Sequence, residues 1–114
     1  MNFGPLPSVD AAAVPAEGFV LDVREDDEWA AGHVEGALHI PMSDFVARFG
    51  ELTEAVEDGR RVHVVCRVGG RSAQVTQYLV RQGIDAVNVD GGMQAWQGAG
   101  RAMVAETGAD AFVL

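Results

Sequence analysis

The sequence predicts an α/β domain with a mainly parallel sheet covered by helices on both faces. Short apolar runs typical of strands alternate along the chain with segments of helical character, and this alternation indicates parallel strands joined by helices. The chain has 114 residues, of which 48 % are hydrophobic and 22 % are charged. This composition excludes a disordered or collagen-like chain, and the length suits a single domain over residues 1–114.

The first expected elements are short. Residues 8–14 predict a brief helix that ends at Pro15, because proline cannot continue a helix. The apolar run 19–23 predicts a mostly buried strand. Residues 26–31 predict a helix closed by Gly32.

A second strand and two helical segments follow. Residues 37–40 predict a short strand that stops at Pro41, and residues 43–49 predict a helix. The apolar face expected for this helix consists of Phe45, Val46 and Phe49. A further helical turn or two over residues 51–57 ends at Gly59.

The strongest strand signal lies at residues 62–66, which are rich in β-branched side chains. A glycine-containing loop then leads into a helix that begins at residue 71 or 72 and runs to residue 82. Residues 86–89 predict another strand, and the helix after it carries Trp96. Residues 101–114 predict a short strand or an extended tail.

The charge of the chain is unevenly distributed. Its net charge is −9, yet residues 59–84 contain five arginines and no acidic residue. A strongly acidic protein is a poor partner for nucleic acid or anionic membranes, so we expect neither. The basic stretch contains the single cysteine, Cys66. A local positive field attracts anions and lowers the pKa of a thiol, which makes this stretch the first functional clue.

Four features favour a cytoplasmic protein without a metal or other cofactor. No apolar stretch approaches the roughly 18 residues of a membrane helix, and Met1 to Asp10 lacks the basic cluster and apolar centre of a secretory signal. A lone cysteine cannot form an internal disulfide. No group of Cys and His residues has the spacing of zinc ligands.

The loop after the strongest strand has the features of a reactive site. Parallel sheets place their sites beyond the carboxyl ends of the strands, where Cys66 is expected. Gly69 and Gly70 allow the backbone to curl, so that several N–H groups point inward, and the following helix adds partial positive charge. We therefore expect Cys66 to be a thiolate near neutral pH in a cradle for an anion. The alternative is a buried, inert cysteine in a tight turn.

Three further motifs accompany this loop. They are Asp22-Val23-Arg24-Glu25, Gly32-His33-Val34-Glu35-Gly36-Ala37-Leu38-His39-Ile40-Pro41, and Gly91-Gly92-x-x-x-Trp96. Together with Cys66-x-x-x-x-Arg71-Ser72, and in this order over about residues 8–104, they resemble the motifs of the rhodanese family of thiosulfate sulfurtransferases.

This resemblance implies both a fold and a reaction. The fold would be a five-stranded, mainly parallel sheet with helices on both faces, formed by a core over about residues 8–104 and followed by a short C-terminal tail. The reaction would be a ping-pong transfer in which the Cys66 thiolate takes the outer sulfur of thiosulfate and sulfite leaves. The Cys66 persulfide would then pass this sulfur to cyanide, to a thiol or to a protein acceptor. No cofactor is implied.

The residues that follow Cys66 are expected to bind the substrate, and they are Arg67, Val68, Gly69, Gly70 and Arg71. Arg67 is expected to contact the sulfonate end of thiosulfate. Arg71 either binds the anion or braces the loop by pairing with an acid such as Asp22 or Glu28. Val68 stands where single-domain members often have a hydroxyl side chain, so one hydrogen bond to the persulfide is missing.

Support for the loop is expected from residues around it, namely Asp22, Arg24 and Ser72. Asp22 and Arg24 lie at the end of another strand, although capping of the turn would explain them equally well. His63 precedes Cys66 by three positions on a strand and so faces the opposite side of the sheet, which makes it a poor base for the thiol.

Three other functions remain open. The first is a phosphatase or arsenate reductase, but related phosphatases have five residues between the cysteine and the arginine, and this chain has four. The second is a non-catalytic rhodanese-like interaction module, although many such modules lack the cysteine. The third is a carrier that receives its persulfide from a partner enzyme and turns thiosulfate over slowly.

Overall fold

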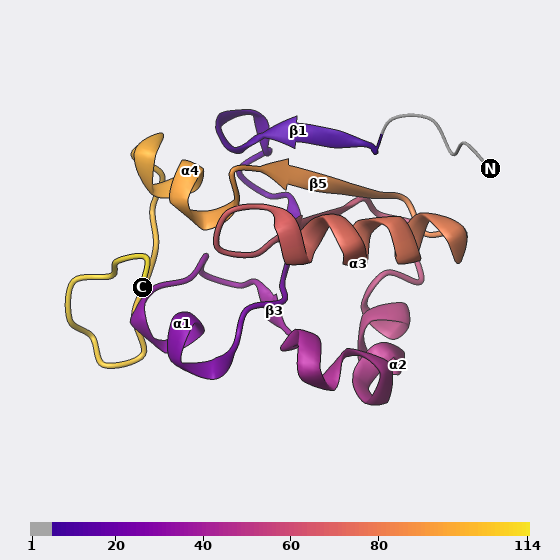
Figure 1. Cartoon of the computed structure of the whole chain (residues 1–114), viewed down its shortest axis with the longest axis horizontal. Helices are drawn as coiled ribbons and strands as arrows, with labels where there is room; N and C mark the ends of the chain where they lie inside the picture. The colour runs from indigo at the N-terminus through magenta and orange to yellow at the C-terminus, as the bar shows by residue number, and fades with distance from the viewer. Residues whose placement is uncertain (1–5) are drawn as a thin grey trace.

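The computed structural model describes residues 6–114. Residues 1–5, which form half of the stretch in which no secretory signal is expected, lie outside the described residues. The described chain forms one sheet with helices packed against it, and the arrowheads of β1 and β5 point to the same end of the molecule (Figure 1). No helix in residues 6–114 is long and apolar enough to cross a membrane.

The sheet is parallel throughout. Its strands are β1 (Ser8–Asp10), β2 (Phe19–Asp22), β3 (Leu38–His39), β4 (Val62–Val65) and β5 (Ala86–Asp90). Their order across the sheet is β1-β5-β4-β2-β3, and every pairing is parallel. This arrangement confirms the predicted fold class. It also puts β4 in the centre, where all four of its residues are buried.

Helices cover both faces of the sheet. They are α1 (Asp26–Ala31), α2 (Phe45–Ala55), α3 (Gly70–Arg81) and α4 (Gly92–Gly98), together with the 3-10 turns η1 (Ala11–Ala13) and η2 (Met42–Asp44). On one face, α2 and α3 form an apolar core with Leu21, Val62 and Val64. On the other face, η1 and α4 pack against Val20, Val65 and Val89.

Three expectations about local structure are wrong. Residues 8–14 are not a helix, because Ser8, Val9 and Asp10 pair with residues of β5 that lie 80 positions away, and only a 3-10 turn follows. Such a distant partner overrides local preference and cannot be read from nearby sequence. Residues 43–49 and 51–57 belong mostly to one helix, α2, which continues through Gly50.

The third error concerns the face of α2. Phe45 and Leu52 are buried, with Phe49 between them, whereas Val46 is 89 % exposed. One residue along a helix turns the side chain by roughly 100°, so a stripe built on residues 45, 49 and 52 leaves the next position in solvent. Residues 101–114 form an extended tail, in which Val104 makes an isolated antiparallel β-bridge with His33.

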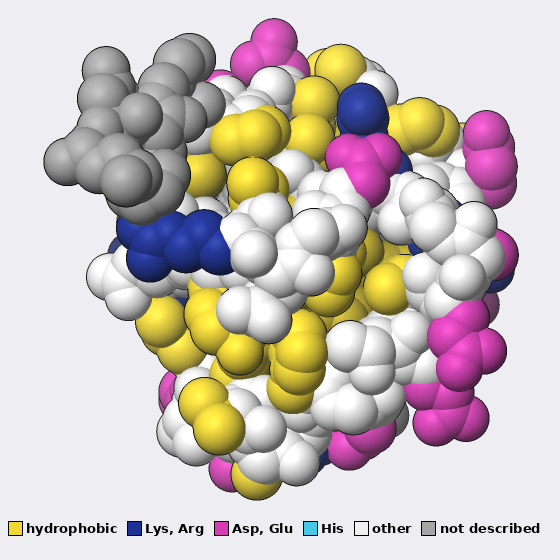
Figure 2. All heavy atoms as spheres, turned by 90° about the vertical axis from the view of Figure 1, so that its right-hand side faces the viewer, with side chains coloured by type: hydrophobic (Ala, Val, Ile, Leu, Met, Phe, Trp, Pro, Cys, Tyr) yellow, Lys and Arg dark blue, Asp and Glu magenta, His cyan; other side chains and the backbone are white. Residues whose placement is uncertain are grey.

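The two ends of the sheet differ in character. Figure 2 shows the face on the right of Figure 1, toward the amino ends of the strands, where apolar side chains surface near the middle and acidic ones gather along one edge. The carboxyl ends lie on the other side, near the starts of α1, α3 and α4. Cys66 follows β4 directly and therefore lies at the carboxyl end.

Candidate active site

Cys66 lies at the carboxyl end of the central strand with 1 % of its surface exposed. Its Sγ atom accepts hydrogen bonds from the backbone N–H of Gly69, at 3.0 Å, and from the hydroxyl of Ser72, at 3.3 Å. Both donors come from the segment that leads into α3. The loop predicted from the sequence therefore closes around the sulfur atom itself.

Gly69 makes this curl possible. Its φ of 111° lies in a region that residues with a side chain rarely adopt. From this conformation its N–H turns toward Cys66, while its carbonyl accepts the first bond of α3, from the N–H of Ala73 at 3.1 Å. The helix begins at Gly70, one residue earlier than expected, so its positive end lies beside the thiol.

The pKa of Cys66 results from opposing effects. Burial raises the pKa of the thiol, because it disfavours the charged thiolate. Hydrogen bonds from the Ser72 hydroxyl and from the backbone N–H groups of Ser72, Gly69 and Val68 lower it. The hydrogen bonds prevail, so the pKa of Cys66 lies below its usual value and the reactive thiolate is favoured.

The start of α4 supports the same loop from the other side. The backbone N–H of Met93 donates to the carbonyl of Cys66 at 2.8 Å, and that of Gln94 donates to the carbonyl of Arg67 at 3.0 Å. Gly92 lies so close that a methyl group there would collide with the Cys66 carbonyl and come within 2.8 Å of that of Arg67. The sequence singles out the Gly91-Gly92 motif, but its contact with the loop becomes visible only in the folded chain.

Asp22 and Arg24 form a fully buried pair with a bond of 2.7 Å between Arg24 Nη2 and Asp22 Oδ2. Arg24 also donates to the carbonyls of Glu28, at 3.2 Å, and Gly32, at 2.8 Å. These bonds fasten α1 to the end of β2. Within the described residues neither side chain hydrogen-bonds Cys66. The pair supports the loop through α1 and through the end of β2, where Asp22 is paired with Val65 of β4.

Arg71 connects the loop to α1. Its two terminal nitrogens donate to the two carboxylate oxygens of Glu28 at 2.7 and 2.9 Å, which is a bidentate pair. The hydrogen bond from Arg71 holds the pKa of Glu28 below its usual value, and that of Arg71 is raised in turn. Of the two acids considered from the sequence, Glu28 is the partner, because Asp22 is already paired with Arg24.

The remaining loop residues are accessible. Val68 is 50 % exposed, and Arg67 donates from Nε to the main-chain oxygen of Leu114 at 3.0 Å. The C-terminal tail therefore reaches the residue expected to bind the sulfonate. His63 lies away from this site, as expected, with its Nδ1 2.9 Å from the carbonyl oxygen of Phe19 at the start of β2.

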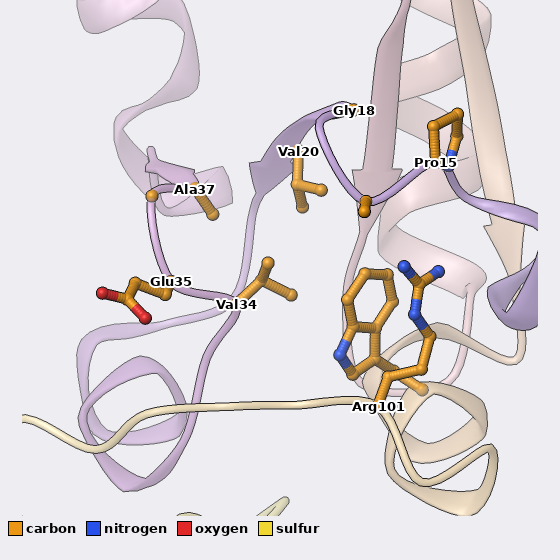
Figure 3. Close-up of a pocket in the computed structure, with 10 residues that line it drawn as sticks. Pro15, Gly18, Val20, Val34, Glu35, Ala37 and Arg101 are labelled. Carbon is orange, nitrogen blue, oxygen red and sulfur yellow. The ribbon is translucent and has the colours of Figure 1, made fainter.

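A separate hollow lies on the face of the sheet that α4 covers (Figure 3). Pro15, Val20 and Val34 line it together with Arg101, whose guanidinium stacks 4.2 Å above the Trp96 ring. Arg101 Nη1 donates to the carbonyls of Ala11 and Val14 at 2.7 and 2.6 Å. These contacts join the end of α4 to η1, so they give Arg101 a structural role.

No group of three or more possible metal ligands among His, Cys, Asp and Glu side chains occurs within residues 6–114. The chemistry that the site offers is that of Cys66 as a nucleophile, with hydrogen-bond donors around its sulfur. The site thus brings together the loop of residues 66–72, Glu28 from α1 and the start of α4.

Comparison with known proteins identifies the family to which this chain belongs. The model of the rhodanese-like domain matches residues 9–99. The chain belongs to the rhodanese-like domain family. This result confirms the resemblance drawn from the four motifs.

Relatives of this rhodanese-like domain include sulfurtransferases. YtwF of Bacillus subtilis, named provisionally as a sulfurtransferase, is 43 % identical over 82 residues, which cover 72 % of this chain and 76 % of YtwF. The thiosulfate sulfurtransferase GlpE of Pseudomonas fluorescens is 33 % identical over 101 residues, or 84 % of this chain and 86 % of GlpE. A rhodanese-related protein of Thermoplasma volcanium has the same fold, with a TM-score of 0.78, 31 % identity, and coverage of 88 % of this chain and 99 % of that one.

Proposed function

We propose that this rhodanese-like domain is a thiosulfate sulfurtransferase that works through a persulfide on Cys66. The observation that carries the proposal is the pair of hydrogen bonds to Cys66 Sγ, from Gly69 N–H and the Ser72 hydroxyl. Donors fixed in this way stabilise a sulfur anion before the reaction and again when sulfur leaves. The relationship to sulfurtransferases supports the same reading.

The reaction proceeds in two balanced steps. In the first, the Cys66 thiolate attacks the outer sulfur of thiosulfate, a new S–S bond forms, and sulfite departs with the electron pair of the bond that breaks. In the second, a thiolate or cyanide attacks the outer sulfur of the persulfide. The acceptor leaves with that sulfur, as a persulfide or as thiocyanate, and the electron pair returns to Cys66 as the thiolate.

Arg67 would hold the sulfonate end of the donor. It follows the nucleophile directly, and its exposed guanidinium belongs to the loop that surrounds the sulfur. The sulfonate sulfur is tetrahedral, and two of its three oxygens can accept hydrogen bonds from the forked donors of arginine. Val68 contributes only its backbone, so no hydroxyl at that position assists the outer sulfur.

Arg71 argues against phosphate chemistry. In a phosphatase loop the arginine would bind two oxygens of the phosphoryl group through its forked donors, whereas both terminal nitrogens of Arg71 are engaged by Glu28. The four residues between Cys66 and Arg71 also make a smaller cradle than the five of the related phosphatases. We therefore expect no hydrolysis of phosphate esters.

The experiment is intact mass spectrometry after addition of thiosulfate, combined with a sulfite assay. We expect a mass gain of one sulfur atom, release of sulfite, and return to the original mass when cyanide is added. Cys66→Ser should show neither the adduct nor sulfite, although it remains folded. An adduct that persists in Cys66→Ser, or hydrolysis of a phosphate ester in place of sulfite release, would overturn the proposal.

The same assay identifies a carrier. A carrier would accept one sulfur per chain from a persulfide donor, yet its sulfite release from thiosulfate would stay slow in the presence of excess cyanide. A sulfurtransferase instead continues to release sulfite until thiosulfate is consumed. Steady turnover is the result that we expect.

A further inference from the structure

The side chain of Asn88 lies beneath the loop that surrounds Cys66. Asn88 belongs to β5, where it is paired with Val64 of β4, and it is 5 % exposed. Its Nδ2 donates to the carbonyl of Gly69 at 3.4 Å. Gly69 is the residue whose N–H donates to the sulfur atom, so Asn88 contacts one of the residues whose hydrogen bonds stabilise the thiolate.

The other end of this amide is not satisfied. No group within residues 6–114 hydrogen-bonds Asn88 Oδ1, although the atom is buried. A buried polar atom without a partner costs free energy, and each such atom in a native protein calls for an explanation. Exchange of the two ends does not help, because it would set Oδ1 against the Gly69 carbonyl, another acceptor.

The residues beside Asn88 are apolar, so an asparagine is unexpected at this position. Val64 beside it and Ala86 two residues earlier belong to the apolar core under α2 and α3. An apolar side chain at position 88 would continue this core without leaving a buried polar atom alone. Stability of the sheet therefore does not explain an asparagine here, whereas the bond to Gly69 does.

We propose that Asn88 is a positioning residue, which holds the Gly69 peptide so that its N–H points at the sulfur of Cys66. The Gly69 carbonyl is held from two sides, by Ala73 N–H in α3 and by Asn88 Nδ2 in β5. Gly69 has no side chain to fix its conformation, and a Cβ there would lie 3.8 Å from Asn88 Nδ2. Asn88 thus couples the sheet to the sulfur cradle without touching the sulfur.

The positioning role of Asn88 depends on the proposed function only where it predicts an effect on sulfur transfer. Its effect on the thiol is independent, because the Gly69 bond lowers the pKa of Cys66 whatever the substrate is. The nearby charge of Arg71 is unchanged by substitutions at position 88 and acts equally in all variants. Two measurements therefore separate the two proposals.

The first measurement is the rate of Cys66 alkylation by iodoacetamide as a function of pH. Asn88→Leu keeps the number and branching of the side-chain heavy atoms but cannot donate, so its alkylation midpoint should rise by roughly half a pKa unit or more. Asn88→Asp has the same shape, but its carboxylate repels both the Gly69 carbonyl and the thiolate, so its midpoint should rise further. This order, with aspartate above leucine and leucine above wild type, is not expected from a loss of stability alone.

The second measurement is steady-state sulfur transfer from thiosulfate. Asn88→Leu should lower kcat roughly tenfold, less than the loss expected on removing such a donor outright, and change KM little. The matched control is Val87→Ala, which truncates a buried residue on the opposite face of the same strand. It should lower stability but leave both the alkylation midpoint and kcat unchanged.

Folded Asn88 variants with wild-type alkylation midpoints would overturn the positioning role, and so would a shift of equal size in Val87→Ala. If Asn88→Leu fails to fold, Asn88→Ala, which is smaller and also lacks the donor, decides the question. If wild type shows the lowered alkylation midpoint but transfers no sulfur, the proposed function fails while the positioning role is still tested by the alkylation midpoint.

Discussion

At the scale of single residues, Cys66 is held between two opposing demands. Its burial keeps water from the sulfur, and this same burial disfavours the thiolate that the chemistry needs. Three backbone N–H groups and one hydroxyl reverse the balance. Ser72, itself fully buried at the start of α3, supplies the side-chain part of that reversal.

Removal of the Ser72 hydroxyl should therefore make the thiol less acidic. Ser72→Ala loses one hydrogen bond to the sulfur, and the pKa of Cys66 should rise by roughly half to one unit. Alkylation by iodoacetamide at a series of pH values measures it. His63→Ala is the control, because His63 contacts the far end of β2. An equal shift in both variants would show that the hydroxyl has no specific effect.

The Glu28–Arg71 pair should make stability depend on pH on the acid side. The pKa of Glu28 is lowered in the folded chain, so the pair contributes fully above the ordinary pKa of a glutamate and is lost as the pH falls through the folded value. Urea unfolding at several pH values should show less loss of stability on acidification in Glu28→Gln than in wild type. Parallel pH profiles would mean that the bidentate contact contributes nothing to stability.

Some of these residues are predictable from the sequence, and others are not for a physical reason. Cys66 and Ser72 lie within one continuous segment, so a strand followed by glycines and a helix suffices to place Ser72 among the residues that support the loop. Asn88 reads only as a member of an apolar strand. Its contact with Gly69 depends on the neighbouring position of β5 beside β4, which the local sequence does not contain.

At the scale of elements, the loop of Cys66 and the start of α4 form one packed unit. Gly91 and Gly92, at the start of α4, both have positive φ angles, and a side chain on Gly92 would collide with the carbonyls of the loop. The N–H groups of Met93 and Gln94 then satisfy these carbonyls. A helix that covers one face of the sheet thus also holds the backbone of Cys66 in place.

Gly92→Ala should damage both stability and activity. Its methyl group would collide with the Cys66 carbonyl, and its φ of 56° is unfavourable for alanine, so a loss on the order of 2–4 kcal/mol is expected. Urea unfolding and sulfite release measure the two effects. Gly98→Ala, at the end of the same helix, meets nothing within 4 Å and should be neutral or slightly stabilising. Similar losses in both variants would contradict the packing argument.

The elements themselves were predictable to different degrees. β-branched residues predict β4, and helical periodicity predicts α3. Both elements occur near the expected bounds. β1 exists because it pairs with β5, so its own residues do not reveal it. Val46 is expected on the inward face of α2 but lies in solvent, because a short window of apolar residues does not specify which side of the stripe meets the sheet.

At the scale of the whole molecule, the C-terminal tail returns to the active-site loop. Its backbone bonds to α1 through the N–H groups of Glu106 and Phe112, and a side chain at Gly32 would run into Phe112. The last described residue, Leu114, accepts a hydrogen bond from Arg67. An anionic donor that uses Arg67 must compete with this contact.

Removal of residues 111–114 should therefore lower the KM for thiosulfate. The reason is that Arg67 Nε no longer donates to the Leu114 oxygen and is available to the sulfonate. Steady-state kinetics measure the effect, and Arg67→Ala should raise KM because one charged contact is lost. In the Arg67→Ala background, the same truncation should have no effect on KM. A truncation effect that survives there would show that the tail acts by another route.

The fold class follows from the alternation of strands and helices, which is a property of the entire chain. The order of the strands does not, because it depends on which distant segments pair. β4 lies between β2 and β5, and its contacts with β2 join residues more than 40 positions apart. The resemblance to a family supplied the number of strands that the local pattern left open.

The central place of β4 has a consequence for the order in which the molecule folds. The cradle needs α1 from the first third of the chain, the loop from the middle, and β5 with α4 from the last third. Pairings so distant in sequence close late, since a long loop of chain must first lose its freedom. During refolding, the reactivity of Cys66 should keep the pH dependence of a free thiol until these segments meet. Brief pulses of an alkylating reagent, given at different times and pH values during refolding, would therefore show when Cys66 acquires its lowered pKa and so when the last stage of folding occurs.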